Sequence, residues 1–318
     1  MMSPRVVYIG APEAAAASFA ERVRGDFPHL ELLATDDRLA AIERLAGAEA
    51  IIGHHFQFDD ALIARAPRLR WIQSLTTGTD AILRLASLPR EVVVTSTRGM
   101  HGPQMSELVL LDMLSLARDF PRMLRNQQQR HWERWPQPLL AGKTAVIVGV
   151  GAISEALAPR CKAFGMTVYG VSGSTRQPAG FDRIFSRGEL CQAAALADFL
   201  VLVVPLSAAT ENLIDGRVLA AMKPTAFLIN VARGGVLDEA ALIDSLRSGR
   251  VAGAALDVFR QVPLPADSQL WGEERIILTP LVGGMSDVYL EQAYPLLRRN
   301  LQCFLSGRMD DMVNVVPH

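Results

Sequence analysis

Two glycines stand where a predicted strand gives way to a helix, an arrangement that suits the pyrophosphate of a dinucleotide. In VIVGVGAIS the strand ends at Gly149. Gly149 and Gly151 allow a tight turn and let the backbone approach a phosphate at the helix N-terminus. Ser154 replaces the usual third glycine and is small enough to keep the helix near the strand. We therefore predict a dinucleotide site that includes Ala152 and Ile153, with an ordinary glycine turn as the alternative.

A polar segment follows the next predicted strand, TVYGV, and bears on the choice of dinucleotide. A site for NAD usually has Asp or Glu about 20 residues after the glycines, where it binds the ribose 2′-hydroxyl. This chain has Ser172-Gly173-Ser174-Thr175-Arg176 instead. Hydroxyls and a guanidinium donate to a 2′-phosphate, whereas a carboxylate would repel it. We therefore expect NADP to be preferred over NAD, with a polar loop without this role as the alternative.

The composition of the chain indicates which classes of molecule the protein can bind. Of the 318 residues, 50% are hydrophobic and 20% are charged, and the formal net charge is −1. No broad positive field exists to hold a nucleic acid or an anionic membrane, and the apolar run FLVLVVPL at 199–206 is far shorter than the roughly 20 residues of a membrane span. We expect small molecules or a second copy of the chain as partners.

The cysteines and the first residues bear on location and metal binding. Cys161, Cys191 and Cys303 are far apart and odd in number, which argues against a disulfide framework and against a zinc site. Residues 1–10 read as a first strand and not as an export signal. We expect a soluble, cytoplasmic protein that binds no metal.

The elements that must position these residues fall into two series of βα units. From residue 6 to about 98, the runs VVYIG, AIIG and VVVTST alternate with helix-like stretches such as 36–46, and a long helix is predicted over 104–130. Pro136, Pro138 and Gly142 then interrupt helical structure. Six parallel strands follow, at 144–149, 167–171, 199–204, 226–231, 252–256 and 276–278, which make a complete Rossmann sheet. A last helix-like stretch, 287–305, could return to the first domain.

Five further segments resemble the D-isomer-specific 2-hydroxyacid dehydrogenases, in particular the glyoxylate/hydroxypyruvate reductase-like branch. They are QSLTTGTDAIL from Gln73, VVPLSAATENLI from Val203, INVARGGVLDEAAL from Ile229, GAALDVF from Gly253 and LTPLVGG from Leu278. The resemblance implies an α/β fold in which a Rossmann dinucleotide-binding domain, 101–285, is inserted into a discontinuous flavodoxin-like substrate domain, 1–100 plus 286–318. It also implies an active site in the interdomain cleft and a homodimer formed largely by the coenzyme domains.

The resemblance assigns roles to individual residues. Arg233, in NVARGG, stands where the family binds its substrate, and its planar fork suits a carboxylate beside a carbonyl. His54, Thr77 and Gly78 are expected near the substrate, although TTGTD departs from the GAGVD that is common in the family. Further coenzyme contacts are expected at Pro205, Thr210, Val231, Ala232, Asp257 and Gly283.

Two departures from the family pattern concern proton transfer. The family has a glutamate in DVFxxEPLP and a histidine in TPHxGG, but this chain has Val262 and Leu281 at these positions. Neither side chain can exchange a proton. His54, His55 and His101 are candidate replacements because imidazole titrates near neutrality. For each of them, a solvated loop or a satisfied structural hydrogen bond is the alternative.

Two functions are therefore consistent with the sequence. The first is an NADP-preferring reductase of a small 2-keto acid, in which Arg233 binds the substrate and a histidine or water donates the proton. General acid catalysis typically contributes about 10² to 10⁴ in rate, so this activity would be atypical or weakened without a replacement. The second is an inactive dinucleotide-binding protein that senses nucleotide occupancy.

Overall fold

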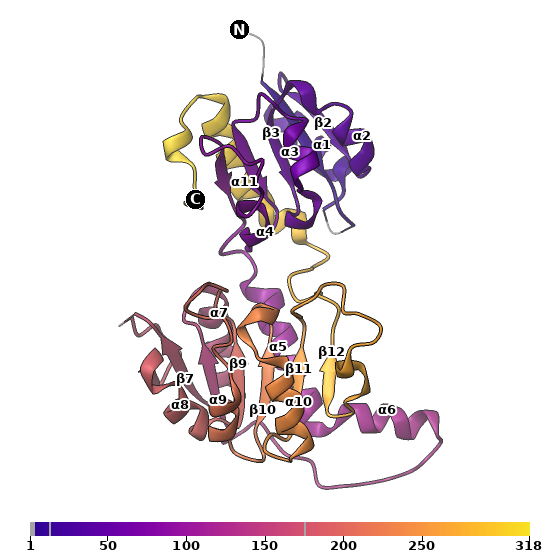
Figure 1. The fold of residues 1–318 in the computed structure, drawn as a ribbon, viewed down its shortest axis with the longest axis vertical. Coiled ribbons are helices and arrows are strands. Elements are labelled where there is room, and N and C mark those ends of the chain that lie inside the picture. The colour runs from indigo at the N-terminus through magenta and orange to yellow at the C-terminus, as the bar shows by residue number, and fades with distance from the viewer. Residues whose placement is uncertain (1–3, 13, 175) are drawn as a thin grey trace. The chain divides into compact units, whose positions relative to one another are not determined.

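The computed structural model describes residues 4–12, 14–174 and 176–318, and Figure 1 shows the chain as a ribbon. The chain divides into two compact units. Unit 1 comprises Met1–Met100 with Met285–His318, and unit 2 comprises His101–Gly284. Each unit has a parallel sheet of its own. Parallel sheets are stable when helices cover both faces, and the fold is accordingly of the predicted α/β class.

The sheet of unit 1 has five parallel strands in the order β2-β1-β3-β4-β5. The strands are β1 (Arg5–Ile9), β2 (Glu31–Thr35), β3 (Ala48–Gly53), β4 (Trp71–Ser74) and β5 (Val93–Thr95). The helices are α1 (Ala16–Asp26), α2 (Arg38–Ile42), α3 (Asp60–Ala64), α4 (Asp80–Leu83) and α11 (Tyr289–Leu305). Alternate residues of β1 enter two different cores, because successive side chains of a strand point to opposite faces. Both faces of this sheet are therefore buried.

The C-terminal helix α11 completes one of these cores. Tyr289, Ala293, Leu297 and Leu301 recur at helical spacing and are buried with residues of β1 and β4. Asn300 is buried on the same helix, and its Nδ2 donates to Gln73 Oε1 at 2.9 Å. The segment after the second series of strands thus belongs to the first compact unit.

The sheet of unit 2 has seven parallel strands in the order β12-β11-β10-β9-β6-β7-β8. The strands are β6 (Thr144–Val148), β7 (Thr167–Ser172), β8 (Arg183–Ser186), β9 (Phe199–Leu202), β10 (Phe227–Asn230), β11 (Gly253–Leu256) and β12 (Ile276–Leu278). The helices are α5 (Gly102–Arg118), α6 (Phe120–Gln128), α7 (Ala152–Ala163), α8 (Leu190–Leu196), α9 (Gly216–Ala221) and α10 (Glu239–Arg247). The strand order reverses direction between β6 and β9, and ligands of such sheets bind at this switch point, beyond the carboxyl ends of the strands.

Three expectations about elements were wrong or incomplete. The predicted helix over 104–130 is two helices, because Asp119 adopts a left-handed conformation with φ 51° and Pro121 lacks the N–H needed to continue α5. The stretch 36–46 holds only the short helix α2 and a 3-10 turn at Leu45–Gly47. The sequence reading also missed β2, β4 and the edge strand β8.

Among the described residues, no helix is both long enough and apolar enough to cross a membrane.

Candidate functional site

The glycine turn of unit 2 lies at the switch point of the sheet. Gly149 follows β6 with φ +107°, a conformation that favours glycine. A Cβ on Gly149 would lie 2.8 Å from the backbone nitrogen of Val204, which follows β9. Gly151 precedes α7, and a Cβ there would have no atom within 4 Å. The backbone at Gly149 is therefore packed tightly against Val204, whereas space remains beside Gly151. A pyrophosphate needs such space to approach the backbone.

Ser154 replaces the third glycine of the motif and stabilises the turn. Its hydroxyl accepts from the N–H of Gly151 at 2.8 Å and donates to the carbonyl of Gly151 at 2.9 Å. The side chain is buried. The first amides of α7, at Ala152 and Ile153, lie where a helix has no internal acceptors, so they suit an anion.

The segment after β7 carries the residues predicted to bind a 2′-phosphate. Ser172 Oγ accepts from the N–H of Ser174 at 3.0 Å, and Arg176 Nη2 donates to Glu155 Oε1 at 2.6 Å. Thr175, which was also predicted here, lies outside the described residues. The sequence reading missed Arg187, whose Nη2 lies 3.8 Å from the position of a Cβ on Gly173. Two arginines thus border this segment, together with one carboxylate from α7.

Arg233 follows β10 in an extended conformation and is half-buried. Its Nη1 donates to the carbonyl of Ala232 at 2.7 Å. Asn230 fixes this turn, since Oδ1 accepts from the N–H of Ala232 at 3.1 Å and Nδ2 donates to the carbonyl of Arg233 at 3.2 Å. A Cβ on Gly234 would lie 1.9 Å from the carbonyl carbon of Phe259, so only glycine fits there. Val231 and Ala232 are buried in the turn.

Asp257 follows β11 and organises the loop that carries Leu281. Its Oδ1 accepts from Thr279 Oγ1 at 2.7 Å and from the N–H of Val282 at 2.9 Å, and its Oδ2 accepts from the N–H of Gly283 at 3.0 Å. Burial raises the pKa of Asp257, and the three hydrogen bonds oppose this shift. Gly283 is closely packed, because a Cβ there would lie 2.7 Å from Leu108 Cδ2 of α5.

The two residues that replace the family's proton-transfer pair are solvent-accessible. Leu281 is 40% exposed and Val262 is 56% exposed. Leu281 has φ +58°, a conformation that is rare for leucine, and its N–H donates to the carbonyls of Asp257 and Thr279, each at 3.1 Å. The loop therefore keeps an unusual backbone conformation while presenting an apolar side chain.

His101 lies at the start of α5 and close to Arg233. Its side chain is buried, and a Cβ on Gly284 would lie 3.5 Å from His101 Cδ2. Burial, together with the positive charge of Arg233, lowers the pKa of His101 to about 4. The structure thus brings His101, Arg233 and the end of the loop at 279–284 together within unit 2.

A buried carboxyl group that the sequence reading missed lies on the same helix. Asp112 is only 2% exposed, and its Oδ2 has no hydrogen-bond partner among the described residues. Burial and the charge of Asp257 raise its pKa to about 7. The sequence signal that could have revealed Asp112 is an acidic residue on the apolar face of a predicted amphipathic helix.

Thr210 and Pro205, which were predicted to contact the coenzyme, form a turn after β9. Thr210 Oγ1 donates to the carbonyl of Pro205 at 2.7 Å and accepts from the N–H of Ser207 at 2.7 Å. The hydroxyl is buried, so it stabilises the turn that follows the strand.

The predicted substrate residues of unit 1 surround the end of β4. Thr76 Oγ1 lies 3.2 Å from His55 Nδ1 and donates to the carbonyl of Gly78 at 2.9 Å. His54 is buried, and its ring stacks on Phe56 with centroids 5.3 Å apart. Thr77 is exposed. Thr76, which stands at the position of the first glycine in the family's GAGVD, is therefore the residue that joins His55 to the Gly78 loop.

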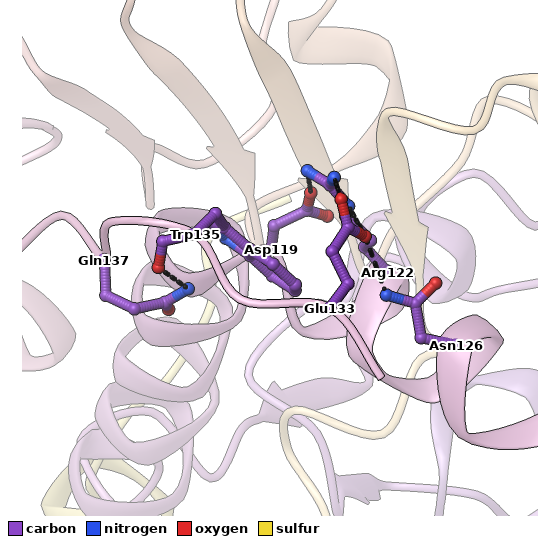
Figure 2. A network of polar contacts seen from close by, with 6 residues as sticks. All are labelled: Asp119, Arg122, Asn126, Glu133, Trp135 and Gln137. Atoms are coloured by element: carbon purple, nitrogen blue, oxygen red, sulfur yellow. Dashed lines mark hydrogen bonds and ion pairs between the residues drawn. The ribbon is translucent and has the colours of Figure 1, made fainter. Parts of the chain in front are cut away.

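A second feature of unit 2 lies away from the glycine turn. Helix α6 has no buried residue among those described and extends from the sheet, as Figure 1 shows. Figure 2 shows the polar contacts that fix the following segment: Arg122 Nε and Asn126 Nδ2 each donate to Glu133 Oε2 at 3.0 Å. The Arg122 guanidinium also lies over the Trp135 ring, 4.4 Å from its centroid. The hydrogen bonds from Asn126 and Arg122 hold the pKa of Glu133 below its usual value.

No group of three or more His, Cys, Asp or Glu side chains that could hold a metal ion occurs among the described residues.

Comparison with known proteins decides the family. A sequence profile of the NAD binding domain of D-isomer specific 2-hydroxyacid dehydrogenases matches residues 110–283. The chain belongs to the D-isomer specific 2-hydroxyacid dehydrogenase family. The resemblance seen in the sequence and the predicted Rossmann fold are thereby confirmed. The chain is accordingly of the NAD(P)-dependent 2-hydroxyacid dehydrogenase type, a family of oxidoreductases.

Three relatives illustrate the similarity. The chain is 36% identical to a (S)-sulfolactate dehydrogenase from Chromohalobacter salexigens over 79% of this chain and 82% of that protein. A family protein from Aeromonas salmonicida has a crystal structure that matches with a TM-score of 0.90 and 34% identity over 99% of both chains. An NADPH-dependent glyoxylate/hydroxypyruvate reductase from Sinorhizobium meliloti, solved with NADP and sulfate, matches with a TM-score of 0.84 and 28% identity, covering 99% of this chain and 98% of that one.

Proposed function

We propose that this 2-hydroxyacid dehydrogenase homologue is an NADP-preferring reductase of a small 2-keto acid, with Arg233 binding the substrate carboxylate. The observation that carries the proposal is the turn after β10. Asn230 and Gly234 hold the Arg233 backbone in one place, and the side chain stays half-buried at the carboxyl edge of the sheet. A guanidinium there can pair with both oxygens of a carboxylate, which a lysine cannot do as well.

The domain roles follow the family pattern. We assign the dinucleotide domain to 101–285 and the substrate domain to 1–100 plus 286–318. The glycine turn and the N-terminus of α7 support the first assignment, because the open side of Gly151 admits a phosphate. Thr76 and His55, which follow β4 and β3, support the second assignment, since their polar side chains lie together beside the Gly78 loop.

The coenzyme residues of unit 2 suit NADP. The amides of Ala152 and Ile153 would hold the pyrophosphate, and Ser172, Ser174 and Arg176 would contact the 2′-phosphate, with Arg187 as a second cation. A bound reduced nicotinamide supplies the hydride for reduction. The relative from Sinorhizobium meliloti was solved with NADP, which favours the same choice here. Glu155 opposes it, because its carboxylate would repel a phosphate.

Arg233 is the residue that we assign to substrate binding and charge stabilisation. Arg233 binds the carboxylate, orients the adjacent carbonyl and stabilises negative charge that develops on its oxygen. The substrate is therefore expected to be small and anionic, as are the 2-keto acids.

A dinucleotide-binding protein without turnover is a second candidate. The exposed, apolar side chains of Leu281 and Val262 favour it, because neither can transfer a proton. Both candidates predict coenzyme binding, so binding alone does not separate them.

NADPH oxidation with a panel of glyoxylate, hydroxypyruvate and bulkier 2-keto acids tests the proposed reductase. We expect turnover with at least one of these acids, and Arg233→Ala should remove it without affecting NADPH binding. Arg250→Ala, at an exposed position, is the matched control. Bound NADPH without turnover on any of the acids would leave the non-enzymatic function.

We also propose a homodimer formed by α5, α6 and the segment after α6. Leu111, Leu114, Phe120 and Leu124 expose apolar side chains on these helices, and Trp132 is 89% exposed. Apolar side chains that are exposed together on neighbouring segments are typical of surfaces that bind other proteins. A second copy presents the same surface, so the contact can be symmetric.

A further inference from the structure

His101 is fixed against two parts of unit 2 that the proposed reaction uses. Its side chain is 7% exposed at the start of α5. A Cβ on Gly284 would lie 3.5 Å from His101 Cδ2 and 3.9 Å from Nε2. Gly284 ends the loop that carries Leu281, so the Cδ2–Nε2 edge of the imidazole faces this loop. The next residue, Gly102, holds the start of α5 against α7, because a Cβ on Gly102 would lie 2.9 Å from Ala156 Cβ.

Burial and a neighbouring positive charge disfavour protonation of the His101 ring. Burial and the Arg233 charge lower its pKa to about 4. Asp257 is a titratable group near the same end of the loop, where its Oδ2 lies 2.9 Å from the position of a Cβ on Gly283. A substrate carboxylate paired with Arg233 would cancel the positive charge and add a negative one. Both changes favour the protonated imidazolium.

We infer that His101 is the proton donor of the proposed reduction, in place of the histidine that Leu281 replaces. The inference rests on the proposed function. As C2 of a bound 2-keto acid accepts a hydride from reduced nicotinamide, the π pair of its C=O bond moves onto oxygen. That oxygen forms an O–H bond with the imidazolium proton, and the N–H bond of His101 breaks. The ring is left neutral, takes a proton from water, and the product is a 2-hydroxy acid.

The other two candidate histidines have different surroundings. His55 Nδ1 lies 3.2 Å from Thr76 Oγ1, and the His54 ring stacks on Phe56 and packs near Tyr289. These contacts lie within unit 1, whereas His101 belongs to the same unit as Arg233, whose charge contributes to the lowered pKa of His101.

The first measurement is the imidazole pKa of His101 by NMR, in the presence of NADP and with or without oxamate. Oxamate carries a carboxylate beside a carbonyl that is not reduced. We expect a pKa well below 6.5 without oxamate and a clear rise with it. In Arg233→Ala, the pKa without oxamate should already be higher, and oxamate should no longer raise it.

The second measurement is turnover of the best 2-keto acid by His101→Gln and His101→Asn. We expect kcat to fall about 10² to 10⁴-fold with little change in NADPH binding or melting temperature. The part of the pH dependence of kcat that follows the His101 pKa in the parent should also disappear. His29→Gln, which changes an exposed histidine, is the control and should match the parent.

The outcomes separate this inference from the proposed function. If the parent reduces no 2-keto acid, the proposed function fails, and the donor role fails with it. If the parent is active while both folded His101 variants retain its turnover, the reductase stands and His101 is not the donor. A pKa that oxamate leaves unchanged, although oxamate binds, would equally overturn the inference.

Discussion

Arg176 and Glu155 form an ion pair beside the glycine turn, with Nη2 and Oε1 2.6 Å apart. The pair joins the segment after β7 to the first turn of α7, at the place where the adenosine ribose is expected. Glu155 can accept hydrogen bonds from a ribose hydroxyl, and Arg176 can donate to a 2′-phosphate. The coenzyme preference therefore depends on whether the Glu155 carboxylate or the Arg176 guanidinium contributes more to binding at the ribose 2′ position.

The first prediction concerns this preference. Arg176→Ala should weaken NADPH binding about 10 to 100-fold and leave NADH binding nearly unchanged, because one charge-assisted hydrogen bond is worth about 1.5–3 kcal/mol. Glu155→Gln should strengthen NADPH binding, since it removes a repelling carboxylate. Titration of coenzyme fluorescence measures both affinities, with the exposed Arg217→Ala as control. Equal affinities for NADPH and NADH in the parent would contradict the predicted preference.

The sequence predicted the structure best where the local backbone requires a particular type of residue. The glycine turn was predictable, because strand, glycines and helix follow one another along the chain. The positions of strands β6, β7, β9, β10, β11 and β12 along the chain were predictable because buried parallel strands read as apolar runs. The family motifs assigned the loop that contains Arg233.

The residues that the sequence did not reveal depend on contacts between distant segments. Glu155 became relevant only because α7 brings it to Arg176, and Asn230 only because its side chain spans the turn that carries Arg233. The strand β8 reads RIFS, a short and half-exposed edge segment without an apolar run. The break at Asp119 depends on a single left-handed residue, which residue periodicity does not detect.

The second prediction concerns Gly149. Alanine at this position requires a left-handed conformation, which costs about 1–2 kcal/mol, and places Cβ 2.8 Å from Val204 N. Gly149→Ala should therefore lower the free energy of unfolding and reduce dinucleotide binding at least tenfold. Gly249→Ala is the matched control, because Gly249 has φ +73° but no atom within 4 Å of the Cβ position. If both variants lost the same stability and both bound dinucleotide normally, close packing at Gly149 would have no role.

The third prediction concerns the pH dependence of stability. The folded-state pKa of Asp112 is raised to about 7, whereas an unfolded aspartate has a pKa of about 3.9. Between these values the folded chain holds a proton that the unfolded chain has lost, so stability falls as pH rises through this window. Asp112→Asn should flatten the fall, and at pH 8 it should be more stable than the parent by about 1–3 kcal/mol.

Thermal unfolding between pH 5 and pH 8.5 measures this difference, with Asp244→Asn at an exposed position as the control. Parallel curves for the parent and Asp112→Asn would show that Asp112 does not titrate in this window.

The fourth prediction concerns assembly. Leu111→Glu with Leu114→Glu places two charges on the exposed face of α5 and should convert a dimer into a monomer. Light scattering after size-exclusion chromatography measures the mass. Leu39→Glu changes a comparably exposed leucine of unit 1 and should leave the mass unchanged. A parent that is monomeric at all concentrations would contradict the proposed dimer.

The fifth prediction restores the family's proton-transfer pair. Leu281 already has φ +58°, and histidine is found in this conformation more often than a branched side chain, so Leu281→His needs no change of the backbone. Val262→Glu would add a carboxylate, and a carboxylate beside an imidazole raises its pKa and favours the acid form. If a weakened proton donor limits the parent, the double variant should reduce the best 2-keto acid about 10 to 100-fold faster.

Each single variant should gain less, because Leu281→His alone lacks the carboxylate and Val262→Glu alone lacks the acid. Combining the double variant with His101→Gln then shows whether the two donors replace one another. If His101 is the parent's donor, its loss should cost much less in the restored background than in the parent. A restored variant that is no faster than the parent, while still binding NADPH, would show that proton transfer does not limit this enzyme.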